Sequence, residues 1–213
     1  MILRKPLNFI SQFLSNIFKQ IRKIYLNSNY YNNKISKISK NSLIYRPSPH
    51  LLSSLIKYQA KKINVNDIAT ENLWDNEKID IKNFRKLNNF YWFFSLDLKS
   101  SKKSTQKIVS DWIEKNFKYN SKSWEFDITS KRIIAWLSNH NLTIEESNKN
   151  YLNHFNLMIH KQANHLMNEI NNSKIINDKM IGCAAIILVG LCYNDEKNYL
   201  AYGLSLLKKI SNL

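Results

Sequence analysis

The side chains that could do chemistry in this sequence are few, and their spacing matches no common metal-binding or catalytic motif. No two histidines are four residues apart, whereas a helical zinc site of the HExxH type needs such a pair on one helix face. We therefore interpret them as surface or packing residues, and we expect no metal and no cofactor. The five histidines are His50, His140, His154, His160 and His165.

The two cysteines, Cys183 and Cys192, lie in one apolar segment. Nine residues of helix rise by about 14 Å, which is beyond the reach of a disulfide. Apolar surroundings raise the pKa of a thiol, so we expect two small buried hydrophobes in a reducing compartment and no nucleophile. The motifs GxGxxG, GxxxxGK[ST] and GxSxG do not occur, which leaves nucleotide binding and a serine-hydrolase elbow without support.

The charge balance is strongly basic, with 32 Lys and Arg against 16 Asp and Glu and a formal net charge of +16. Such a balance favours an acidic partner, namely nucleic acid, anionic lipid or an acidic glycan. The lysines are spread along the chain, and the abundance of Lys, Asn and Ile is equally well explained by an AT-rich coding sequence.

The elements that would position these residues are helices, because only three glycines and three prolines punctuate 213 residues. Residues 6–26 form an amphipathic helix with a basic C-terminal end, which packs on the domain or a partner, or lies on a membrane surface. No signal peptide is evident, and the longest apolar run, 180–192, is too short to span a bilayer. The apolar positions of the first helix are Leu7, Ile10, Leu14, Ile17, Ile21 and Ile24.

The rest of the chain divides into a linker and a series of helices. Residues 27–49 are rich in Asn, Ser and Lys and indicate a linker or irregular arm, and 50–83 have weak periodicity. Thr143 and Glu146 have the spacing of a capping box that would open one of the later helices. Antiparallel helices in a bundle, solenoid or toroid are expected, over residues 84–94, 104–117, 129–138, 143–170, 179–192 and 196–210.

Residues 87–144 resemble the N-terminal helical domain of bacterial heparinase II/III family proteins, which are polysaccharide lyases. That family reads LHGFxWLRxLRA, a helix ending in DWI, then W and DVTxRRLxxWL. Its LxRQAxHL resembles residues 159–166, and its AGL resembles 189–191. The matching residues of the first region are Leu87, Phe90, Trp92, Leu96, Leu98, Asp111, Trp112, Ile113, Trp124, Asp127, Thr129, Arg132, Trp136 and Leu137.

The resemblance implies an all-α fold, an incomplete (α/α) toroid, and β-elimination on a uronate-containing polysaccharide. That reaction needs a group that neutralises the uronate carboxylate, a base for the C5 proton and an acid for the leaving oxygen. Asn177 matches the family's carboxylate-binding Asn, although an Asn capping the next helix explains it as well. Arg132, Trp136 and His165 are the other candidates for the glycan groove, and Arg132 is equally well a structural partner of Asp127 or a packed stem.

The family's Tyr-bearing segment and its β-sandwich would follow Leu213. We therefore expect residues 1–49 to form a helix plus arm, and 50–213 to form the glycan-binding half of a lyase that is inactive without a β-sandwich domain or split-gene partner. The expected location is bacterial, cytoplasmic or peripheral to a membrane through residues 6–26. The alternative is a non-catalytic basic helical module for nucleic acid or a membrane surface.

Overall fold

The computed structural model describes residues 4–37, 43–48, 73–74, 79–97, 99–193 and 198–212, with the backbone alone for 4–11. These ranges are helical and contain no β-strand; Leu43 and Tyr193 form an isolated β-bridge. The α-helices are α1 Arg4–Leu26, α2 Asn29–Ile35, α4 Ile81–Asn88, α5 Lys102–Lys115, α6 Phe126–Ser138, α7 His140–Thr143, α8 Lys149–Glu169, α9 Ile176–Cys192 and α10 Tyr199–Ser211, and the 3-10 helices are η2 Tyr91–Ser95 and η3 Ile170–Asn172.

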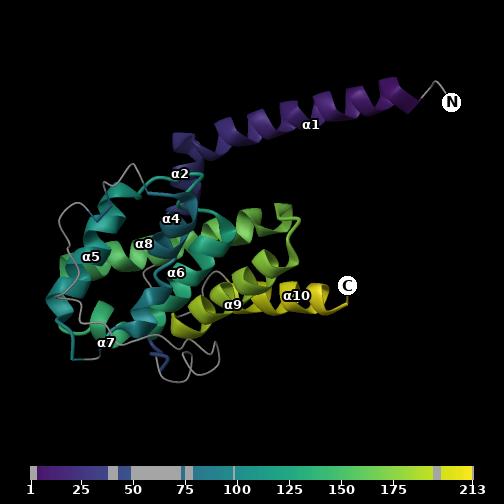
Figure 1. Cartoon of the computed structure of the whole chain (residues 1–213). Helices are drawn as coiled ribbons and strands as arrows, with labels where there is room; N and C mark the ends of the chain where they lie inside the picture. Colours follow the sequence, from purple (N-terminus) through teal and green to yellow (C-terminus); the bar gives the residue numbers. More distant parts are fainter. Residues whose placement is uncertain are drawn as a thin grey trace.

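The helices pack around α6, α8 and α9. Helix α9 lies against α6 and α8 on one side and forms a hairpin with α10 on another, while α5 and α7 cover the opposite end of α6 and α8. Helix α1 extends away from this body and meets it at its C-terminal end (Figure 1). None of the helices in the described ranges has the length and apolar character needed to cross a bilayer.

Aromatic side chains form the centre of the core. Trp112, Trp124 and Trp136 are each at most 1% exposed. The Phe90 ring meets Trp136 edge-on at 5.1 Å and Trp112 at 6.0 Å between ring centroids. Edge-to-face pairs of this kind stabilise a core beyond their buried area, so these rings fix how α5, α6 and η2 pack.

The predictions for residues 6–26, 104–117, 129–138, 179–192 and 196–210 are confirmed as helices within a few residues. The single helix expected over 84–94 is wrong. Helix α4 ends at Asn88, and Phe90 adopts a left-handed backbone with φ 58° before η2 begins. This conformation is unfavourable for a bulky residue, and it is compensated by complete burial of the Phe90 ring in the aromatic core.

The capping box expected at Thr143 is also wrong. Thr143 ends α7, and its Oγ1 donates to the backbone oxygen of Trp136 at 2.9 Å. Helix α8 is capped instead by Asn148, whose Oδ1 accepts a hydrogen bond from the Tyr151 N–H at 2.9 Å. The Thr-x-x-Glu spacing therefore falls on the end of one helix rather than on the start of the next.

The linker expected over 27–49 is wrong for Asn29–Ile35, which form α2. Ser28 caps this helix by accepting from the Tyr31 N–H at 3.1 Å, and Tyr31 and Ile35 are fully buried against α8. This part of the N-terminal region belongs to the same core as the later helices. The expected boundary between 49 and 50 lies outside the described residues, as do most of residues 50–83.

Glycines set the close approach of α9 and α10. A Cβ on Gly190 would lie 2.6 Å from the backbone N of Leu200 in α10, and one on Gly203 would lie 2.5 Å from Cγ1 of Ile187. Gly182 and Ala184, two other small residues of α9, do not contact α10 in this way. A Cβ on Gly182 would meet only the side chains of Ile170, at 2.9 Å, and Ser130, and Ala184 is exposed.

We expect Gly190→Ala to destabilise the chain by about 1–3 kcal/mol, because the added methyl group forces the α10 backbone away from α9. This loss opposes the gain of up to about 1 kcal/mol that Ala gives in a helix interior. Gly182→Ala is the matched control, since the flexible end of Ile170 can move aside, and it should be near neutral. Urea unfolding followed by circular dichroism measures both; equal stabilities for the two variants would contradict the close contact at Gly190.

Candidate functional site

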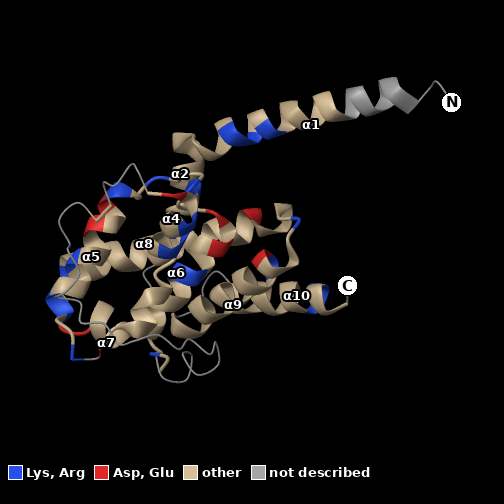
Figure 2. Cartoon of the chain, viewed as in Figure 1, with Lys and Arg blue, Asp and Glu red and all other residues tan. Residues whose placement is uncertain are grey.

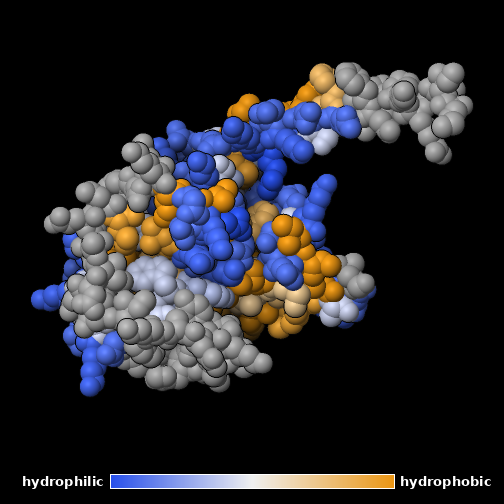
Figure 3. Space-filling model, viewed as in Figure 1, coloured by the Kyte–Doolittle hydropathy of each residue, from blue (hydrophilic) through white to orange (hydrophobic). Residues whose placement is uncertain are grey.

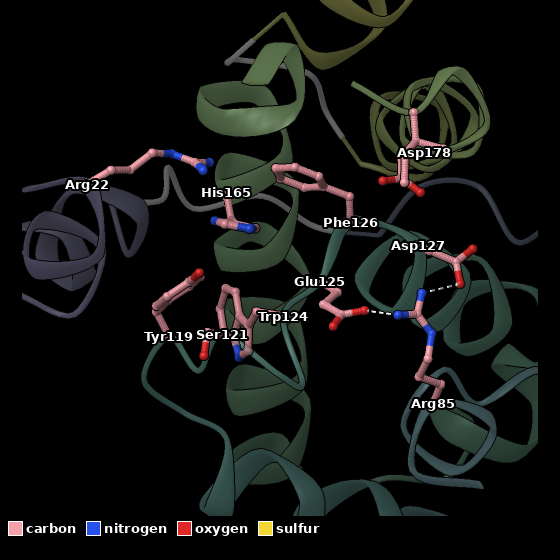
Figure 4. A pocket seen from close by; sticks show the side chains of 11 residues that line it. Arg22, Arg85, Tyr119, Ser121, Trp124, Glu125, Phe126, Asp127, His165 and Asp178 are labelled. Atoms are coloured by element: carbon pink, nitrogen blue, oxygen red, sulfur yellow. Dashed lines mark hydrogen bonds and ion pairs between the residues drawn. The ribbon is translucent and has the colours of Figure 1, made fainter. Parts of the chain in front are cut away.

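A pocket of about 300 Å³ opens between α1, α4, the loop before α6, α8 and the start of α9. Figure 4 shows that it has an aromatic half around His165 and a charged half around Arg85, with Phe126 between them. Two arginines and three carboxylates give the lining a formal net charge of −1. The lining residues are Arg22, Arg85, Tyr119, Ser121, Trp124, Glu125, Phe126, Asp127, His165, Ile175 and Asp178.

The loop from 116 to 125 is held in place by two hydrogen bonds within it and two from other elements. Trp124 Nε1 donates to the Asn116 backbone oxygen at 3.2 Å, and Ser123 Oγ donates to Asn116 Oδ1 at 2.7 Å. The Tyr119 N–H donates to Oδ1 of Asn32 in α2 at 3.1 Å, and Arg132 Nη1 donates to the Ser123 backbone oxygen at 3.0 Å. Tyr119 and Trp124 are therefore positioned by a fixed backbone, although they lie outside any helix.

Arg85 joins the two carboxylates at the start of α6. Its Nη1 donates to Glu125 Oε2, and its Nη2 lies 3.5 Å from Asp127 Oδ2. Lys131, one turn further along α6, pairs with the other Asp127 oxygen at 2.6 Å. Glu125 and Asp127 sit at a helix N-terminus, where the helix dipole also favours negative charge.

The pKa of the Glu125 carboxyl group is raised. Burial is the main cause, and the negative charges of Asp127 and Asp178 add to it, while Arg85 opposes them. All three carboxylates line the pocket. They form a compact set of hydrogen-bond acceptors at the mouth of the pocket.

Arg22 brings α1 to the pocket. Its Nε and Nη2 donate to Glu169 Oε2 at 3.0 and 2.7 Å, and Glu169 also accepts from Asn172 Nδ2 at 3.0 Å. The Arg22 side chain is 42% exposed, and its guanidinium group reaches toward the pocket above His165 (Figure 4). In the described ranges its Nη1 forms no hydrogen bond with the protein, so one edge of the group faces the pocket.

His165 forms the floor of the aromatic half. Its Nδ1 and the Tyr31 hydroxyl are 2.7 Å apart, and the Phe126 ring stacks on the imidazole at 5.8 Å between centroids. Tyr119 and Trp124 complete the surroundings, at 5.3 and 5.5 Å. Burial lowers the pKa of His165 to about 3, so the ring is neutral near pH 7 and is a weak base.

Of the four residues that the sequence proposes for a groove, His165 lies in the pocket. Arg132 and Trp136 are 0% exposed, so the structure places them in the core and away from any ligand. Arg132 has no ion pair with Asp127 in the described ranges; it stacks on Trp112 at 3.8 Å and donates to Gln162 at 2.8 Å. The interpretation of Arg132 as a packed structural residue is the one that the structure supports.

Asn177 lies beside the pocket but does not line it. It is exposed in the first turn of α9, and the pocket is lined by its neighbour Asp178 and by Ile175. Asn177 is not a helix cap either, because the N-cap position of α9 is Ile175. Ser173 Oγ donates to Asp178 Oδ2 at 2.9 Å and so fixes this carboxylate at the rim.

The sequence reasoning missed Arg22, Arg85, Glu125 and Asp178. A usable signal was present only for the acidic pair, because the run Trp124–Asp127 places two carboxylates at a helix start, where the dipole favours them. The arginines carry no local signal, since Arg22 meets Glu169 across 147 residues and Arg85 meets Glu125 across 40.

The remaining reactive groups do not add a second site. Cys183 and Cys192 are free and buried on α9, and burial raises the pKa of Cys192 to about 12. This agrees with the expected role as buried hydrophobes. The described ranges contain no group of three or more His, Cys, Asp or Glu side chains that could hold a metal ion.

No model of a protein family, no curated protein and no solved structure matches this chain.

We expect acid to destabilise the fold through His165. Its pKa is about 3 in the folded chain and 6.5 for an unperturbed histidine, so below pH 6.5 the unfolded chain takes up a proton that the folded chain does not. The free energy of unfolding should then fall by at most about 1.4 kcal/mol per pH unit between about pH 6.5 and 3.

His165→Gln should flatten this dependence, whereas His154→Gln, on the exposed side of the same helix, should leave it unchanged. Urea unfolding at a series of pH values measures the slope for each chain. If His165→Gln kept the full slope of the unsubstituted chain, the burial of a neutral His165 would be disproved.

Proposed function

We propose that this chain is a carbohydrate-binding helical module and that its pocket holds one ring of an acidic, uronate-containing polysaccharide. The observation that carries the proposal is the composition of the pocket. Partly exposed faces of Tyr119 and Phe126 stand beside fixed carboxylates and a half-exposed guanidinium group. Aromatic faces cover the apolar side of a sugar ring, and charged planar groups bind its hydroxyl and carboxylate groups.

The charges suggest how a repeating acidic glycan would lie. Carboxylates outnumber arginines in the lining, so the pocket itself suits a hydroxyl-rich ring, with Asp127 and Asp178 as acceptors. The neighbouring uronate would place its carboxylate against the open edge of Arg22 at the rim. The chain's overall charge of +16 would draw a polyanion toward the surface before contact.

We propose that the chain has the fold of the helical half of a heparinase II/III-like lyase, the family that its sequence resembles. This half would be built as an incomplete (α/α) toroid. The antiparallel α9–α10 hairpin supports it, because a toroid is built from such hairpins. The exposed apolar side chains Met180, Leu191, Leu204 and Leu207 on this hairpin are of the kind that a further hairpin would cover.

Binding of nucleic acid is the less favoured alternative. A groove for a nucleic-acid backbone needs Lys and Arg gathered along one face. In the view of Figure 2 the basic residues are spread over several helices and the loops, and acidic residues stand among them near the pocket.

We expect Arg22→Gln to weaken binding of a uronate–hexosamine tetrasaccharide by about tenfold, the loss of one charge-assisted interaction. Binding of the same tetrasaccharide with its carboxyl groups reduced to alcohols should be unaffected by this substitution. Arg46→Gln is the control, because Arg46 is also half-exposed but lies outside the pocket. Isothermal titration calorimetry measures each pair; no binding of either glycan, or an equal effect of both substitutions, would refute the proposal.

Binding without elimination is expected for this pocket. Burial lowers the pKa of His165 and raises that of Tyr119, so neither side chain is suited to take a C5 proton near pH 7. Incubation with a uronate polymer should therefore give no ultraviolet absorbance of an unsaturated uronate. Formation of that product by the purified chain, and its loss in Tyr119→Phe, would place the elimination in this pocket.

A further inference from the structure

Helix α1 offers a surface that the rest of the chain does not use. It has 23 residues and is about 35 Å long at 1.5 Å per residue. Every residue from Gln12 to Ile21 is exposed, and contact with the body is made by the last turns, through Arg22 and the buried Leu26. Figure 1 shows this helix extending from the body.

The apolar side chains of α1 gather on one side. At 100° per residue, a single stripe of about half the helix circumference contains all the large apolar residues of the exposed part. They are Phe13, Leu14, Ile17, Phe18, Ile21 and Ile24, which are 38–71% exposed.

This stripe faces away from the body. Leu26, which is buried in the body, lies on the polar side of the helix, roughly opposite to Phe13, Ile17 and Ile24. Arg22 and Tyr25 also contact the body, and they lie at the edge of the stripe next to Phe18. Figure 3 shows the hydrophobic residues along the edge of α1 that is farther from the body, with hydrophilic residues on the nearer side. The orientation leaves the stripe open to a flat surface without interference from the other helices.

The charge of α1 selects the partner. Five of its residues are basic, namely Arg4, Lys5, Lys19, Arg22 and Lys23, and none is acidic. A second copy of α1 would bring like charges together, and nucleic acid would leave the apolar stripe in water. An anionic lipid surface suits both faces, because the stripe enters the boundary between headgroups and acyl chains while the basic residues of the polar face add electrostatic attraction to anionic lipid.

We propose that α1 binds the surface of an anionic membrane and lies in its plane. Because Leu26, which anchors α1 in the body, lies on the side opposite to the stripe, the pocket stays on the side of α1 away from the lipid and remains open to solvent. This inference does not depend on what the pocket binds.

Sedimentation of the full chain with phospholipid vesicles tests the proposal. We expect binding to vesicles that contain phosphatidylglycerol, weaker binding to pure phosphatidylcholine, and a decrease at high salt. Phe18→Ala with Ile21→Ala should weaken binding by at least about tenfold, since both side chains leave the apolar boundary. Lys19→Gln with Lys23→Gln should cost about fivefold per lysine on anionic vesicles and little on neutral ones.

The matched control is Leu204→Ala with Leu207→Ala, which removes exposed apolar side chains of α10 that are 52% and 44% exposed. This double substitution should leave vesicle binding unchanged. The proposal is overturned if the control weakens binding as much as the α1 variant does, or if the chain does not bind anionic vesicles. It is also overturned if analytical ultracentrifugation shows that Phe18 and Ile21 hold a dimer in place of a lipid contact. Circular dichroism and urea unfolding of each variant give a readout of folding that is independent of what the pocket binds.

Discussion

The buried guanidinium group of Arg132 ties together the elements that make the pocket. From α6 it donates to Gln162 of α8, to the last backbone oxygen of α4 at Asn88, and to Ser123 in the loop. It also stacks on the Trp112 ring of α5. In the described ranges no carboxylate pairs with it, and burial lowers the pKa of Arg132 well below its usual value. A charge held only by neutral oxygens and a ring tolerates little displacement, so the loop and α4 keep fixed positions relative to α6.

The hydrogen bonds of Arg132 also explain why the helix breaks after Asn88, which the sequence does not reveal. Asn88 accepts from Trp112 through its side chain, at 2.8 Å, and from Arg132 through its backbone. The bond from Arg132 satisfies a backbone oxygen at the end of α4, where a helix leaves its carbonyls without internal partners. Phe90 then turns into the aromatic core with a left-handed backbone. The apolar periodicity of residues 84–94 gives no sign that a helix ends at Asn88. In α1, α5, α6, α9 and α10, by contrast, each helix has its own apolar side and could be predicted from spacing alone. The short α2 could not, because Tyr31 becomes a core residue only by meeting His165, 134 residues away.

The pocket could be predicted only in part, for a similar reason. An Arg or Trp at helical spacing is compatible with a groove and with a core, and Arg132 and Trp136 turn out to be buried. The sequence points to His165 because residues 159–166 resemble the family's LxRQAxHL segment. The side chains around His165, however, come from α2 and from the loop that Arg132 holds. Arg22 is the clearest case: its helix is exposed from Gln12 to Ile21, and in the described part of the chain its partner is Glu169 at the end of α8. Such long-range pairs leave no trace in local composition.

The charge of the chain and the charge of the pocket act over different distances. A net charge of +16 affects how an acidic partner approaches, over a screening length of about 8 Å at physiological salt. Within hydrogen-bond distance the field is set by single groups, and in the pocket Glu125, Asp127 and Asp178 outnumber the two arginines. Burial raises the pKa of Glu125, and the charges of Asp127 and Asp178 add to this while Arg85 opposes it. The acidic glycan that we propose would therefore be attracted by the whole surface, but the pocket would hold its less acidic units. The net charge of the chain alone would instead suggest that the pocket holds the acidic units.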